Sequence, residues 1–385
     1  MEKIINFLLF CYLVLFPFGQ LGRLPLKLAG IPEVNFYLTD LLVGGIGLIW
    51  AVGVVGKKGY QPPPLTKQIL VFLGITAFSL VVNIPLLSGR EVVVASLYWL
   101  RLLAYFGFYL VIAWAKWADW SDLLLASGTM GAIFGLVQYF LWPDMSALTA
   151  LGWDPHYYRL VGTFFDPNFT GIILVLTIIL LTANFRKKPI YYLLFTICYL
   201  ALALTYSRAS WLAFLAGITA LFLIKKIKKK VGLIIFITFI MVITILILPR
   251  EPGGEGVKLE RIVSVQSRLG SWRQALVIAK DHPLLGIGFN AYRYAQKRYG
   301  FLEENWQLSH AGAGADNSIL FILATSGILG LLGLLGLLGI IFQLSFRNSP
   351  LVFSSMIAVL IHSLFNNTLF YPWVMGWLAI ILSTM

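Results

Sequence analysis

Charged residues are scarce in this sequence: Asp, Glu, Lys and Arg make up 12% of the 385 residues, whereas 59% are hydrophobic. Soluble globular domains carry about 25% charged residues, so the composition excludes a soluble domain and predicts an integral membrane protein. Cysteine is also rare. Cys11 and Cys198 both fall within apolar runs, which excludes a disulfide framework. The four histidines are scattered without metal-ligand spacing, so we expect neither a metal nor a cofactor.

Long apolar runs recur along the whole chain. They predict an all-α integral membrane protein, with residues 1–385 forming a single polytopic domain of about twelve transmembrane helices. The candidate spans lie near residues 4–21, 36–55, 68–87, 93–115, 121–141, 168–184, 190–206, 208–224, 231–249, 316–344, 349–365 and 369–384.

The net charge of +13 is concentrated in alternate short loops, most densely in the lysine-rich run at 225–230. In a polytopic membrane protein this pattern indicates cytoplasmic loops. Strict alternation then places both termini in the cytoplasm. We therefore expect membrane lipids, and no nucleic acid, as the partners of these basic residues.

One loop is much longer than the others. Residues 250–315, between the ninth and tenth spans, fall on the extracytoplasmic side by the same alternation. Helix-like periodicity in "SVQSRLGSWRQALVIAKDH" and several aromatic residues predict a partly helical, folded segment on the membrane. Loops of this length in a compact protein are usually functional unless they are disordered.

Several arginines are candidates for binding an anionic substrate. Arg101 lies in the middle of an apolar span, where it needs a polar cavity or an ion-pair partner, and either role is open. Arg208 lies in the first turn of the eighth span, where the helix dipole already favours an anion, so we expect it to contact one directly. Arg159 precedes the sixth span. Arg268 and Arg273 are about 140° apart on a helix, so one can reach a site while the other braces the loop.

The tenth span, near 316–344, opens with a short polar segment. Asp316 and Asn317 are expected to cap this helix, and Asn317 is also a candidate substrate-binding residue. His310 lies one "AGAGA" away. Asp316 and His310 are the two candidates for a catalytic base. Five glycines that recur every three residues from Gly327 are expected to allow close helix packing.

Together these features resemble the O-antigen ligase and polymerase superfamily of bacterial envelope glycosyltransferases. In the ligases the tenth span opens with His, then Asn, Ser or Gln, nine residues, Gly, two residues, and Gly, Thr or Tyr. Asp316, Asn317, Gly327 and Gly330 match this motif except at the histidine. Arg208 and Leu212 match the family's "Arg, three residues, Leu", and "DHPLLGIGFNAY" is similar to its loop sequence.

The resemblance implies a membrane enzyme in the bacterial cytoplasmic membrane with its active site on the extracytoplasmic face. The donor would be a glycan on a polyprenyl-pyrophosphate lipid such as undecaprenyl pyrophosphate, and the acceptor a glycan or glycolipid hydroxyl, as in lipopolysaccharide and polysaccharide biosynthesis. Arginines would hold the pyrophosphate, and a base at the Asp316 position would deprotonate the acceptor, with inversion and without a metal. Ligase and polymerase activities both remain open. A lipid-linked glycan flippase or transporter and a non-catalytic scaffold are the alternatives.

Overall fold

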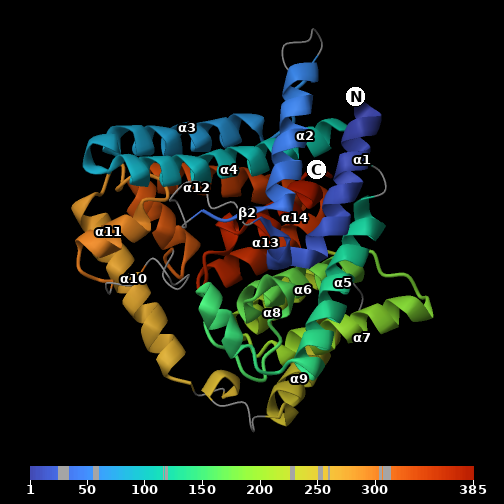
Figure 1. Ribbon diagram of the computed structural model, residues 1–385. Helices are drawn as coiled ribbons and strands as arrows, with labels where there is room; N and C mark the ends of the chain where they lie inside the picture. The colour runs from blue at the N-terminus through green and yellow to red at the C-terminus, as the bar shows by residue number, and fades with distance from the viewer. Residues whose placement is uncertain are drawn as a thin grey trace.

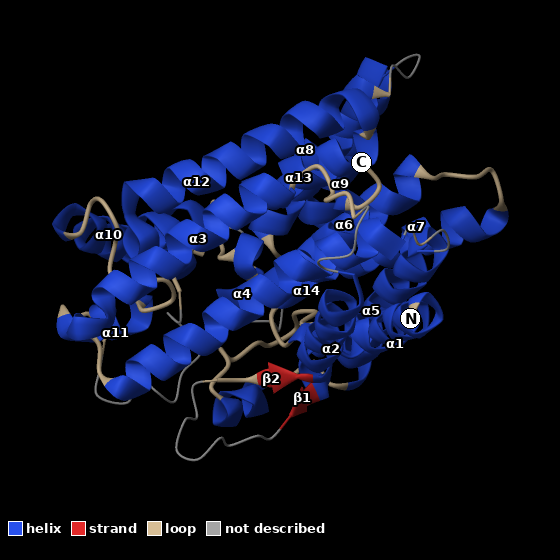
Figure 2. Cartoon of the chain, turned by 90° about the horizontal axis from the view of Figure 1, so that it is seen from above, coloured by secondary structure: helices blue, strands red, loops and turns tan. Residues whose placement is uncertain are grey.

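The computed structural model describes residues 1–24, 34–54, 60–115, 117, 120–225, 230–249, 255–258, 261–302, 306 and 314–385. Most of this part of the chain is helical (Figure 1). The helices are α1 (Glu2–Leu15), α2 (Leu38–Val54), α3 (Thr66–Asn83), α4 (Gly89–Ala115), α5 (Trp120–Leu141), α6 (Pro167–Ala183), α7 (Pro189–Leu204), α8 (Arg208–Ile224), α9 (Lys230–Ile247), α10 (Val263–Asp281), α11 (Tyr292–Arg298), α12 (Ser318–Asn348), α13 (Pro350–Ser363) and α14 (Pro372–Leu382). Two short strands, β1 (Arg23–Leu24) and β2 (Phe36–Tyr37), pair antiparallel (Figure 2).

Short 3-10 helices connect these elements. They are η1 (Phe16–Gly22), η2 (Ile84–Leu86), η3 (Ser146–Leu151), η4 (Gly162–Phe164), η5 (Glu255–Val257) and η7 (Thr368–Phe370).

The apolar helices confirm the prediction of a mainly helical membrane protein. Among the described residues, five helical segments are long and apolar enough to cross a membrane: Glu2–Gly22, Thr66–Leu86, Gly89–Ala115, Trp120–Leu141 and Ser318–Asn348. The shorter apolar helices α2, α6, α7, α8, α9, α13 and α14 overlap the remaining predicted spans.

Helices α6 and α14 form the centre of the bundle. Almost every residue of α6 from Thr170 to Leu181 is buried, and so is α14 from Pro372 to Ile381. A helix that is apolar on all faces is stable in such a position because its neighbours cover it completely. Helix α13 packs on α8 and α6, and α14 packs on α4. The longer helices α3, α4 and α12 lie at the side of this core (Figures 1 and 2).

Helix α12 is broken at Gly327, where φ is 65° and ψ is −165°. The turn between α10 and α11 inserts at the break. The Ile328 amide donates to the Pro283 carbonyl (2.8 Å), and the Ile287 amide donates to the Ala324 carbonyl (3.2 Å). These bonds satisfy backbone groups that the broken helix leaves without partners.

The glycine row of α12 therefore has more than the expected packing role. A Cβ at Gly327 would lie 2.2 Å from the Leu284 carbonyl oxygen, so this glycine permits the insertion of the turn. Gly333 does allow α3 to approach, because a Cβ there would lie 3.0 Å from Ile75. Gly336 and Gly339 face open space.

The predicted helix in the long loop is confirmed as α10, and the shorter α11 follows it. Both lie at the end of the bundle away from the two chain termini (Figures 1 and 2). Phe289, Tyr292 and Tyr294 are buried against the bundle. The described part of the loop is therefore packed onto the helices.

Candidate functional site

A cavity of about 460 Å³ lies at the starts of α6, α12 and α14 and beside α4 from Val94 to Leu102. Because the first amide groups of a helix have no partner within it, these helix starts favour negative charge. Polar and charged residues from several segments line the cavity. They are Arg101, Asp154, His156, Arg159, Asp166, Asn168, Arg261, Ser264, Ser267, Arg268, Asn290, Arg293, Asp316, Asn366 and Asn367.

Backbone carbonyls hold three of the lining arginines. Arg159 Nε donates to Thr205 (3.1 Å) and Arg268 Nε to Phe365 (3.1 Å). Arg261 donates from Nη2 to Tyr206 (2.8 Å) and from Nη1 to Gly256 and Lys258. The bundle thus orients each planar guanidinium and leaves further N–H groups for another partner. We call Arg159, Arg261 and Arg268 the arginine wall.

The arginine wall has no carboxylate partner within the described part of the chain, where no ion pair shorter than 4 Å involves it. Burial and the neighbouring Arg261 lower the pKa of Arg159 to about 9, and burial with Arg208 and Arg268 lowers that of Arg261 to about 10. Arg159 is only 7% exposed, and its Nη2 is buried without a hydrogen bond. Asp166 acts electrostatically on Arg159 and Asp316 on Arg268, but within the described residues neither carboxylate forms an ion pair with them. Buried cations that lack a direct ion pair are costly, so this geometry favours an anionic ligand.

Arg208 begins α8, as predicted, and Ser207 caps the helix by accepting from the Ser210 amide. The Arg208 guanidinium donates to Ser264 Oγ (2.7 Å), and Ser264 lines the cavity. Arg208 is therefore not a lining residue, but it contacts the cavity wall through Ser264.

Asp316 also lines the cavity and is close enough to Arg268 for each to shift the pKa of the other. Its backbone is fixed, because its amide donates to Ser271 Oγ (3.0 Å) and its carbonyl accepts from Trp272 Nε1 (3.0 Å). No described residue hydrogen-bonds to its carboxylate. Burial raises the pKa of Asp316 to about 6, while Arg268 opposes the shift.

The expectation that Asp316 shares the capping of α12 is wrong. Asn317 alone is the N-cap: its Oδ1 accepts from the amides of Ile319 (2.9 Å) and Leu320 (3.0 Å). Its Nδ2 donates to the Leu364 carbonyl (3.2 Å). Asn317 is buried in these contacts and is not among the residues that line the cavity. His310, the other candidate base, lies outside the described residues.

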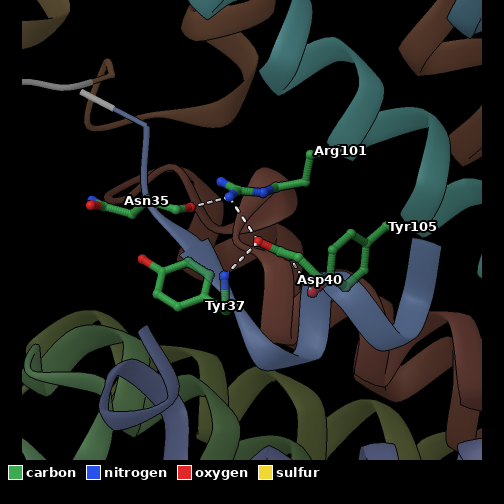
Figure 3. Close-up of polar contacts among 5 residues, drawn as sticks. All are labelled: Asn35, Tyr37, Asp40, Arg101 and Tyr105. Carbon is green, nitrogen blue, oxygen red and sulfur yellow. Dashed lines mark hydrogen bonds and ion pairs between the residues drawn. The ribbon is translucent and has the colours of Figure 1, made fainter. Parts of the chain in front are cut away.

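The other predicted arginines differ in whether they line the cavity. Arg268 faces the cavity whereas Arg273, on the same helix, is exposed and does not line it. Arg101 lines the cavity but forms an ion pair with Asp40 of α2 (2.7 Å) (Figure 3). Tyr105 Oη donates to the same carboxylate (3.1 Å). Arg101 thus ties α4 to α2 at the cavity wall.

Sequence reasoning missed Arg261, His156 and Asp154. None of the three lies in a periodic segment, and only the aromatic character of residues 142–167 hinted at a folded loop there. His156 is 9% exposed, and its Nε2 is buried without a hydrogen bond. Burial and Arg159 lower the pKa of His156 to about 4, so it is neutral at physiological pH. Asp166 lines the cavity and caps α6 by accepting from the Asn168 and Phe169 amides.

Fold and cavity together define a helical membrane protein with a polar, arginine-rich site at the starts of several helices. Residues 191–335 match the family model described as O-antigen ligase. The matched segment runs from α7 into α12 and contains Arg208, Arg261, Arg268 and Asp316, so the resemblance noted in the sequence is confirmed. It supports a role in glycan transfer for polysaccharide biosynthesis. No curated protein matches the chain.

Proposed function

We propose that this protein transfers a glycan from a polyprenyl-pyrophosphate carrier to an acceptor hydroxyl, as an O-antigen ligase or polymerase does. The observation that carries the proposal is the arginine wall. Three oriented guanidinium groups, none of which forms an ion pair within the described part of the chain, provide the donors and the positive charge that a pyrophosphate requires.

The reaction follows from this arrangement. The acceptor oxygen forms a bond to the anomeric carbon, the bond from that carbon to the pyrophosphate oxygen breaks, and the configuration inverts. Negative charge grows on the leaving pyrophosphate, and the arginine wall stabilises it. The acceptor proton passes to Asp316. With a pKa of about 6, this carboxylate is mainly ionised near neutral pH and is a stronger base than an ordinary aspartate.

We place the cavity on the extracytoplasmic face. The helices whose starts surround it are the sixth, tenth and twelfth apolar segments, and all three begin on that side if the lysine-rich loops are cytoplasmic. On this topology the chain has twelve spans with both termini inside, and residues 250–315 lie outside. The donor lipid would then enter from the outer leaflet.

The topology can be tested with single cysteines in a background in which Cys11 and Cys198 are replaced. We expect Lys187→Cys, between α6 and α7, and Lys280→Cys, at the end of α10, to react with an impermeant maleimide from opposite sides of the membrane. Both positions are exposed. Labelling of both from one side would contradict the topology.

The activity can be tested in proteoliposomes supplied with a glycan on polyprenyl pyrophosphate, with and without candidate acceptors. We expect acceptor-dependent release of polyprenyl pyrophosphate, and loss of that release in Arg268→Ala. Arg273→Ala is the matched control, because it removes an exposed arginine five residues away on the same helix. Transbilayer movement of the donor without transfer would favour a flippase instead.

A further inference from the structure

A buried chain of hydrogen bonds ends at a cavity residue that has no role in the proposed reaction so far. It connects Thr368 Oγ1 to His362 Nδ1 (2.6 Å), His362 Nε2 to Ser210 Oγ (3.2 Å), Ser210 Oγ to Ser207 Oγ (2.9 Å) and Ser207 Oγ to Asn168 Oδ1 (2.8 Å). The first four residues are 0% exposed, whereas Asn168 lines the cavity.

The hydrogen bonds give this chain a direction. Ser207 Oγ accepts from the Ser210 amide (3.3 Å) and donates to Asn168 Oδ1 (2.8 Å). Ser210 Oγ donates to Ser207 Oγ (2.9 Å), and the Asn168 carbonyl oxygen is a second acceptor 3.3 Å away. The side-chain atom of Asn168 that accepts from Ser207 is its oxygen, because an amide nitrogen only donates.

The histidine continues the chain in the same direction. When the Ser210 proton points to Ser207, Ser210 Oγ accepts from His362 Nε2 (3.2 Å), and His362 Nδ1 accepts from Thr368 Oγ1 (2.6 Å).

The consequence lies at the cavity. With its Oδ1 held by Ser207, Asn168 presents its NH₂ group away from the chain, and within the described part of the protein this group has no hydrogen-bond partner. Asn168 belongs to the first turn of α6. Asp166 occupies the Asn168 and Phe169 amides as the cap (2.7 and 2.9 Å), so the side-chain NH₂ is the donor that Asn168 has left.

We propose that Asn168 is an anion-binding residue that donates its side-chain NH₂ to a phosphate oxygen, and that Thr368, His362, Ser210 and Ser207 are positioning residues that hold the amide in this orientation. The inference rests on the proposed function, because it deepens the pyrophosphate site formed by the arginine wall.

The test measures the Kd of inorganic pyrophosphate for the full-length protein in nanodiscs by calorimetry. A variant that cannot form one hydrogen bond to a charged ligand should bind that ligand about 10- to 100-fold more weakly. We expect this weakening in Asn168→Ala, and a larger one in Asn168→Asp, which still accepts from Ser207 but replaces the donor by negative charge. Asn184→Ala is the matched control, because Asn184 caps the far end of α6 and bonds to Ser121.

The positioning role is tested by a double-mutant cycle. Ser210→Ala interrupts the chain with a small change, and we expect it to weaken binding about 3- to 10-fold, less than the loss of the whole bond to the charged group. In the Asn168→Ala background it should have no further effect on the Kd. An equal loss in both backgrounds would show a merely structural role and would overturn the positioning claim.

The outcomes separate the two proposals. Binding that is weakened by Arg268→Ala but unchanged by Asn168→Ala would overturn only the role of Asn168. Absence of pyrophosphate binding, or binding unaffected by Arg268→Ala, would overturn the pyrophosphate site and the role of Asn168 together.

Discussion

Replacing Asp316 by asparagine separates a catalytic base from a structural residue. The capping bonds of α12 are made by Asn317, and the bonds of Asp316 to Ser271 and Trp272 use only its backbone. Asn has nearly the same shape, so Asp316→Asn should fold and insert normally. It cannot accept the acceptor proton, however, and a positioned base contributes about 10²- to 10⁴-fold to the rate. We expect a loss of that size in kcat.

The stability of this variant has a predictable pH dependence. The pKa of Asp316 is raised from 3.8 to about 6, so the folded state binds the proton more tightly than the unfolded chain. The ionised form therefore costs about 3 kcal/mol at neutral pH. This penalty is absent below pH 4 and grows as the pH rises to 6. Asp316→Asn should be as stable as the wild type or more stable at pH 7.5, and the difference should disappear at pH 4.

The pH profile of the wild type checks the same group. For a base with a pKa of about 6, kcat/KM should fall about tenfold between its plateau and pH 5. Asp122→Asn is the control, because Asp122 is exposed at the start of α5. Near-normal turnover in Asp316→Asn would refute the assignment. Loss of turnover in His310→Ala instead would assign the base to His310.

Three further substitutions follow from the geometry. Arg208→Ala should strongly reduce transfer without unfolding the protein, because it removes the bond to Ser264 and a positive charge beside Arg261. Arg208→Lys should restore transfer only in part, because an ammonium cannot reproduce the fork of a guanidinium; an in vitro transfer assay decides. Gly327→Ala should lower the melting temperature, because its Cβ would lie 2.2 Å from the Leu284 carbonyl oxygen and the φ of 65° is strained for alanine. Gly336→Ala is the control and should leave the melting temperature unchanged, because its Cβ would meet no described atom within 4 Å. Asp40→Asn should destabilise the protein by about 3–5 kcal/mol, because it leaves the buried Arg101 without its counter-charge. Thermal unfolding of the detergent-solubilised protein measures this change, and an unchanged stability would contradict the prediction.

The helices could be predicted from the sequence because lipid imposes a simple rule. Each helix in hydrocarbon must be apolar and must satisfy its own backbone, so every apolar run became a helix. Arg208 was placed correctly for the same reason, since the polar interruption "TYSR" must lie between two helices. The start of α12 needed a finer rule. Asp and Asn are both good caps, and sequence alone could not tell which of two neighbours takes the position.

The site depends on contacts between distant parts of the chain, and these were harder to predict. Arg261 joins the arginine wall because it bonds to Tyr206, 55 residues earlier. The partner of Arg101 is Asp40 on another helix, and the sequence indicated only that such a partner was needed. No local pattern encodes either pairing.

The matched motif of the tenth span has a geometric meaning in this fold. Helix α10 and the first part of α12 are joined at two places: Asp316 bonds to Ser271, and Ile328 bonds to Pro283. Ser271 and Pro283 are as far apart in the sequence as Asp316 and Ile328 are. The two segments therefore run side by side in the same direction, over roughly 18 Å at the rise of an α-helix.

The break at Gly327 makes the second junction possible, because only a residue without a Cβ admits the turn after α10 at that point. The spacing between Asp316 and Gly327 therefore sets how far α10 extends beside α12. Since Arg268 lies one turn before Ser271 on α10, this spacing also fixes the arginine relative to the carboxylate. The motif links the position of the base to the position of the anion site, which explains why one short sequence carries both a polar residue at the helix start and a glycine well inside the helix.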